Sequence, residues 1–192
     1  MISVLNRIST WRYILPLFAS FCFVTFRIFP TYSSRLQDIA GQEIQLLDIR
    51  FSYATSEVLY DFEKLGTEGR DLYKVIAGRI DMIYPIIYGL LFISVLAYLL
   101  KRVTNTNSKL LFIATLPALG VTFDYLENLN TLSLLNDFPN LTDQGVAWGE
   151  QMTRMKLGSL FFSFVVAFSL ASFLLIKSLM NCKENKIVHR LM

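Results

Sequence analysis

Three acidic residues in apolar stretches of this 192-residue sequence could do chemistry, namely Asp81, Asp124 and Glu127. Asp124, Glu127 and Asn128 are spaced i, i+3 and i+4, so on a helix they share one face. Two carboxylates one turn apart in apolar surroundings do not both ionise easily, and a carboxyl group kept neutral suits a general acid or base. We therefore predict Asp81, Asp124 and Glu127 as candidate catalytic residues, and the sequence leaves open whether any reaction takes place.

Tyrosines follow Asp81 at helical spacing. Tyr84 and Tyr88 stand three and seven residues after Asp81, so the three form one stripe, and Pro85 eases a local bend. Polar side chains inside a membrane are costly and are usually functional. The residues predicted to bind a ligand are Arg27, Tyr84, Tyr88, Asn128 and Arg70.

Arg27 lies inside the first apolar stretch. Counted at 1.5 Å of helical rise from the basic residue that starts each stretch, Arg27 and Asp124 both lie ~22 Å in. We therefore expect Arg27 to form an ion pair with Asp124 or Glu127. The polar residues at this level could line a chamber that opens outward above an apolar floor, or they could be structural and only set the register of the helices.

Several classes of enzyme lack their residues here. Cys22 and Cys182 are the only cysteines and His189 is the only histidine, which excludes thiol oxidoreductases, paired-histidine haem sites and zinc proteases. The aspartate motifs of membrane prenyltransferases and CDP-alcohol phosphotransferases are also missing. Mg²⁺ or Ca²⁺ would need Asp81 or Glu57 beside the acids of the third stretch. We predict no metal site and no cofactor.

A glycine-containing turn at residues 66–70 could bind an anion. Gly66 and Gly69 precede Arg70, and a helix N-terminus beside a cation can hold a phosphate. Glu68 and Asp71 would oppose an anion, so the motif is a weak one. It is the reason for including Arg70 among the ligand-binding residues.

The composition predicts a membrane protein. Hydrophobic residues make up 54% and charged residues 17% of the chain, which is more apolar than an ordinary soluble domain. A hydrocarbon slab of ~30 Å needs about 20 helical residues. We predict an all-α, polytopic four-helix bundle that forms a single membrane domain over residues 1–192. The expected spans are about 11–30, 82–101, 109–134 and 156–178, with an amphipathic helical segment at about 31–81 whose helix over 51–65 ends at Gly66.

The charges are divided between the two ends of these spans. One end, which we call the basic end, receives nine lysines and arginines and, of the acids, only Glu184. The other end, the acidic end, holds the remaining fourteen acids. Under the positive-inside rule the basic end is cytosolic, so both termini are cytosolic and the 31–81 segment is extracytosolic. The predicted location is the plasma or inner membrane.

Two classes of function follow. The first is a protein that binds, and in one version transforms, a lipid or lipophilic small molecule in a chamber built on Asp81, Asp124 and Glu127. The alternative is a non-catalytic subunit or assembly factor whose intramembrane polar residues are structural. The expected partners are membrane lipids, a lipophilic ligand, and either another membrane protein or a second copy of this chain. No basic patch interleaved with aromatic residues indicates nucleic acid.

Overall fold

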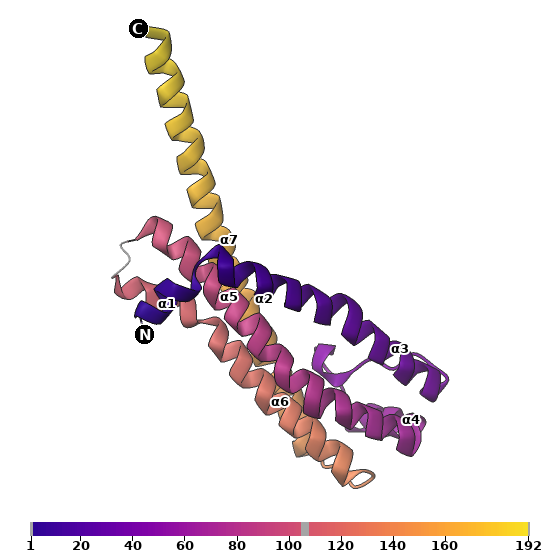
Figure 1. The fold of residues 1–192 in the computed structure, drawn as a ribbon. Coiled ribbons are helices and arrows are strands. Elements are labelled where there is room, and N and C mark those ends of the chain that lie inside the picture. Colours follow the sequence, from indigo (N-terminus) through magenta and orange to yellow (C-terminus); the bar gives the residue numbers. More distant parts are fainter. Residues whose placement is uncertain (1, 105–107, 192) are drawn as a thin grey trace.

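The computed structural model describes residues 2–104 and 108–191, with side chains up to residue 181 (Figure 1). Within these residues the chain is helical, and no strand is present. Four helices are long and apolar enough to cross a membrane: Trp11–Ala40, Thr55–Val103, Lys109–Asp137 and Asp143–Asn181. The predicted all-helical class and the number of long apolar helices are therefore confirmed.

The first long helix extends beyond the expected span. A short helix α1 (Ile2–Ile8) precedes α2 (Trp11–Phe23), a π-helical turn η1 (Val24–Ile28) and α3 (Phe29–Ala40). The helix continues past Pro30, where the expected span ends, and the π-helical turn η1 lies just before this proline. The helix ends at Gly41, whose φ of 66° is left-handed and suits glycine.

The segment between the first two long helices folds back over the acidic end. A loop with one 3-10 turn η2 (Leu47–Ile49) leads into α4 (Thr55–Val75), which continues through a π-helical turn η3 (Ile76–Ile80) into α5 (Asp81–Val103). Gly66, with φ 59°, interrupts α4, so the predicted break at this residue is confirmed. Glu57 accepts a hydrogen bond of 2.9 Å from the Ala54 amide and caps α4.

The last two long helices form an antiparallel hairpin. After a 3-10 turn η4 (Lys109–Thr115), α6 (Pro117–Asp137) is joined by residues 138–142 to α7 (Asp143–Leu191). Helices α6 and α7 make the most extensive helix–helix contact, and α5 packs against α2, α6 and α7. The C-terminal part of α7 projects away from the other helices (Figure 1).

Glycines allow the helices to approach closely. A Cβ atom at Gly120 would lie 2.8 Å from Cδ2 of Leu160, on the facing side of the hairpin. A Cβ atom at Gly89 of α5 would overlap the side chain of Val121 on α6. Small residues at such crossings let neighbouring backbones pack tightly. The close packing holds α5, α6 and α7 in a defined register, and this register determines which polar side chains meet.

Candidate functional site

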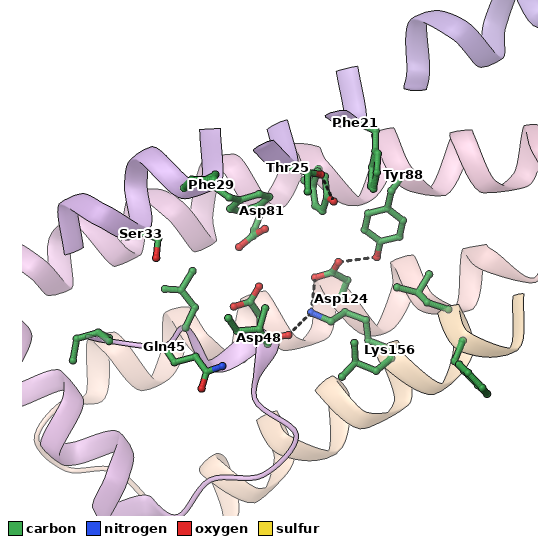
Figure 2. A pocket seen from close by; sticks show the side chains of 18 of the residues that line it. Phe21, Thr25, Phe29, Ser33, Gln45, Asp48, Asp81, Tyr88, Asp124 and Lys156 are labelled. Atoms are coloured by element: carbon green, nitrogen blue, oxygen red, sulfur yellow. Dashed lines mark hydrogen bonds and ion pairs between the residues drawn. The ribbon is translucent and has the colours of Figure 1, made fainter. Parts of the chain in front are cut away.

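A cavity of about 830 Å³ lies at the acidic end of the helices. Its wall includes Asp81, Tyr84 and Tyr88 of α5 and Asp124 of α6, four of the residues predicted from the sequence. Side chains from α2, η1 and α3 form one side and side chains from the first half of α7 form another. Figure 2 shows the carboxyl groups of Asp48, Asp81 and Asp124 directed into the same space.

Lys156 of α7 is the cation of this site. Its ammonium nitrogen lies 2.6 Å from Oε2 of Glu127 and 3.7 Å from Oδ1 of Asp124. It also donates a hydrogen bond of 3.1 Å to the main-chain oxygen of Asp48 (Figure 2). One ammonium group therefore compensates two carboxylates and also satisfies a main-chain oxygen.

The prediction that Arg27 forms an ion pair with Asp124 or Glu127 is wrong. Arg27 is exposed, and no ion pair among the described residues involves it. It lies on η1, in a long helix that packs against α5, whereas Asp124 lies on α6, whose main partner is α7. Helical rise predicted a common level for Arg27 and Asp124, but level alone does not decide which helices are neighbours.

The hairpin geometry explains why Lys156 takes this place. In two antiparallel helices, residues equally far from the connecting turn lie side by side. Asp124 and Lys156 are both sixteen residues from Asn140, and Glu127 and Thr153 are both thirteen residues from it. Sequence reasoning missed Lys156 because it treated this residue as the boundary of the fourth span. The short connection at 138–142 was the signal that could have found it.

Glu127 and Asn128 lie behind the wall of the cavity. Glu127 is fully buried, accepts a hydrogen bond from the Thr153 hydroxyl, and is not among the residues that line the cavity. Asn128 donates to the main-chain oxygen of Asp81 at 2.9 Å and to Oδ1 of Asp124 at 3.3 Å. Glu127 thus positions Lys156, and Asn128 ties α6 to the start of α5.

Asp124 is held on two further sides. The Tyr88 hydroxyl donates to Oδ2 of Asp124 at 2.7 Å, and Tyr84 makes a hydrogen bond of 2.9 Å with Thr25 of η1. The Asp124 carboxylate, which faces Tyr88, Asn128 and Lys156, is therefore well satisfied even though it is only 5% exposed.

Asp81 and Asp48 differ from Asp124 in lacking such partners. Asp81 is only 5% exposed, yet none of the hydrogen bonds or ion pairs among the described residues involves its carboxylate. Oδ1 of Asp48 is also buried without a hydrogen-bond partner. Buried polar groups normally have partners, so these two carboxylates are the unsatisfied groups of the site. The sequence did not single out Asp48. Its position depends on the loop that folds back onto the helices, where the neighbouring Leu46 and Leu47 are buried.

An aromatic cluster separates the acids from an apolar region. Tyr84 lies 5.3 Å from Tyr88, 5.0 Å from Phe29 and 5.8 Å from Phe21 between ring centroids. Below it is a second cavity of about 460 Å³, whose lining is almost entirely apolar and runs toward Trp11 at the basic end. Four residues line both cavities, so the two adjoin: Phe21, Phe92, Leu160 and Phe164. The arrangement is a polar chamber above an apolar groove.

Arg70 is placed elsewhere. Its guanidinium donates a hydrogen bond of 2.8 Å to the main-chain oxygen of Phe62 and packs 4.4 Å from the ring centroid of Phe138. Arg70 thus satisfies a carbonyl group at the break in α4, and it is not among the residues that line the 830 Å³ cavity. The structure does not bring this predicted ligand-binding residue together with the acids.

Tyr53 covers Glu127 and Thr153 from the loop at the acidic end. Burial raises the pKa of its phenol to about 12, so the hydroxyl stays neutral. Among the residues whose side chains are described, no group of three or more histidines, cysteines or acids is arranged to hold a metal ion. Glu57, considered as a metal ligand from the sequence, instead caps α4.

Comparison with known proteins does not assign this chain to a family. No family model matches the chain, and neither a curated protein nor a solved structure shows significant similarity to it.

Proposed function

We propose that this chain is a multi-pass membrane protein that binds an amphipathic lipid or other lipophilic small molecule in the cavity at its acidic end. The observation that carries this proposal is a cavity of about 830 Å³ whose wall combines carboxylates with aromatic and aliphatic side chains. Ligand pockets typically enclose about 300–1,000 Å³. Protein interiors are otherwise close-packed, so a purely structural polar network would not need this space.

The exposed surface of the long helices supports placement in a membrane. Phe161, Phe164 and Phe168 are each about two-thirds exposed on one side of α7. A soluble monomer rarely exposes so much contiguous apolar surface, whereas hydrocarbon is a suitable solvent for it. The positive-inside rule then places the basic end in the cytosol and opens the cavity toward the outer side.

The cavity has a route to the lipid phase in this arrangement. The first long helix packs against α5, and α7 packs against α5 and α6, so the first and last long helices flank the cavity from opposite sides. Phe161 and Phe164 are strongly exposed and also line the cavity. A lipophilic molecule could therefore enter sideways between the first and fourth spans.

A non-catalytic subunit remains the second candidate. The Lys156 ammonium satisfies Glu127 and Asp124 internally, as expected of a network that only joins helices. Asp81 distinguishes the two candidates, because a structural network would not leave its carboxylate unpaired in a cavity.

Mass spectrometry of small molecules retained after gentle detergent purification tests the proposal. We expect a stoichiometric lipid on the unaltered protein and its loss in Leu157→Trp, which fills the cavity wall. Leu175→Trp is the matched control, since Leu175 is exposed on the same helix and is not part of the lining of either cavity. No retained molecule, or equal retention in both variants, would contradict the proposal, and a co-purifying protein in its place would favour the subunit.

A further inference from the structure

We infer that the ligand is an amphiphile with a protonated amine at one end and a hydrocarbon chain at the other. The inference rests on the proposed binding function and adds the chemical class of the ligand. It comes from the charge of the chamber, from the unpaired Asp81 and from the apolar groove below it.

The charge of the chamber favours a cation. Glu43, Asp48, Asp81 and Asp124 line it, and Lys156 is the only lysine or arginine of its lining. The Lys156 ammonium already contacts Glu127, Asp124 and the main-chain oxygen of Asp48. Its charge is therefore already compensated by these oxygens, and the four acids of the lining would repel an anionic headgroup.

Asp81 is the group that would receive the amine. It is buried and lines the chamber, and its carboxylate has no hydrogen-bond or ion-pair partner among the described residues. Oδ1 of Asp48 is buried and unpartnered as well, and Figure 2 shows the Asp48 side chain at the same cavity. An ammonium group offers three donors and a positive charge, so it can satisfy both carboxylates and remove their repulsion.

The aromatic side chains suit the same headgroup. Phe21, Phe29, Tyr84 and Tyr88 all line the chamber that Asp81 also lines. The faces of aromatic rings attract cations, more strongly where water is excluded. An alcohol headgroup could donate a hydrogen bond to a carboxylate, but it would lack the attraction of a cation to the aromatic rings.

The apolar groove would receive the chain. It adjoins the chamber at the side chains that line both cavities, and of its lining residues only Ser163 and Trp11 carry a polar side-chain atom. With the headgroup at Asp81, the chain would run down the groove toward the basic end, as a lipid tail does toward the middle of a bilayer. A bare metal ion would leave the groove unused, and the acids are not arranged to hold one.

Three probes with one chain and different headgroups test the inference on full-length protein in phosphatidylcholine nanodiscs. Radiolabelled hexadecylamine is bound at equilibrium and displaced by unlabelled hexadecylamine, hexadecanol or hexadecanoate, with empty nanodiscs as the baseline. We expect saturable binding of the amine, weaker competition by the alcohol and none by the carboxylate. Asp81→Asn should weaken amine binding about tenfold or more, the size of one charged hydrogen bond. Asp71→Asn, an exposed acid of α4 outside the cavity lining, should bind as the unaltered protein does.

The possible results separate this inference from the proposed function. If hexadecanol binds as tightly as hexadecylamine and Asp81→Asn changes neither affinity, the amine assignment is wrong while the lipid-binding function stands. If no probe binds and no molecule is retained on purification, both are wrong. Asp81→Glu keeps the charge and should retain part of the affinity, which guards against a loss caused by misfolding. A diazirine at the end of the amine's chain should label residues of the groove such as Val95, and labelling elsewhere would overturn the predicted orientation.

Discussion

The ammonium nitrogen of Lys156 lies 2.6 Å from Oε2 of Glu127, and this contact joins α7 to α6 inside the protein. Both side chains are almost completely buried. A buried ion pair of this kind contributes little net free energy, but removing one partner leaves the other charge uncompensated. The contact therefore makes Lys156 and Glu127 sensitive positions for stability, whereas the unpaired Asp81 is the sensitive position for ligand binding.

Replacing Lys156 by methionine should destabilise the protein. The substitution leaves Glu127 and Asp124 buried without their cation, which typically costs about 3–5 kcal/mol. Thermal unfolding in detergent should show a clearly lower Tm, and the double variant Lys156→Met/Glu127→Gln should recover part of the loss. Lys177→Met, on the exposed surface of the same helix, is the control and should unfold near the normal temperature. An unchanged Tm for Lys156→Met would show that the network does not form.

Arg27→Gln should leave the stability almost unchanged. Arg27 is exposed and has no ion-pair partner among the described residues, and substitutions at such positions usually change stability by less than about 0.5 kcal/mol. Thermal unfolding in detergent measures this stability change. A loss of stability as large as that of Lys156→Met would restore the expectation that Arg27 pairs with Asp124 or Glu127.

Glu127→Gln and Asp81→Asn should act on different properties. Glu127→Gln weakens the contact with Lys156 and should lower stability by about 1–3 kcal/mol, since one charged hydrogen bond is lost. Asp81→Asn removes an unpaired buried charge, so stability should stay equal or rise while a retained molecule is lost. Unfolding and ligand retention are measured together on both proteins. A large stability loss in Asp81→Asn without any bound molecule to lose would favour the structural alternative.

Cysteine labelling should establish the orientation. In a background without Cys22, cysteine introduced at Gln45 or Asp143 should react with an impermeant reagent in intact cells, because both positions are exposed at the acidic end. Native Cys182, whose side chain lies outside the described residues, should react only after permeabilisation. Labelling of Cys182 in intact cells would reverse the orientation and turn the chamber toward the cytosol.

Gly89→Ala should test the close crossing of α5 and α6. The added methyl group would overlap Val121, and overpacking of this kind costs about 1–3 kcal/mol. Val121→Ala should relieve the overlap, so the double variant should be more stable than Gly89→Ala alone. Gly158→Ala is the matched control, because a Cβ atom there meets no atom within 4 Å.

Much of the fold could be predicted from local features of the sequence. Long apolar runs predict helices that can cross a membrane, because hydrocarbon cannot satisfy backbone polar groups and each helix must do so internally. The break in α4 at Gly66 was predictable because glycine adopts a left-handed φ at low cost. The stripe of Asp81, Tyr84 and Tyr88 was predictable from helical periodicity alone.

The sequence by itself thus determined the helices, their polar faces and the level at which acids occur, since these depend on residues close together in the chain. Only the tertiary structure decided the partners, because helical rise gives depth but not which helices are neighbours. It put Lys156 beside Glu127 where Arg27 was expected, since α6 and α7 form a hairpin and Arg27 lies on another helix. It also folded the loop of Asp48 back to the cavity that Asp81 lines, a juxtaposition across thirty-three residues that no local pattern predicts.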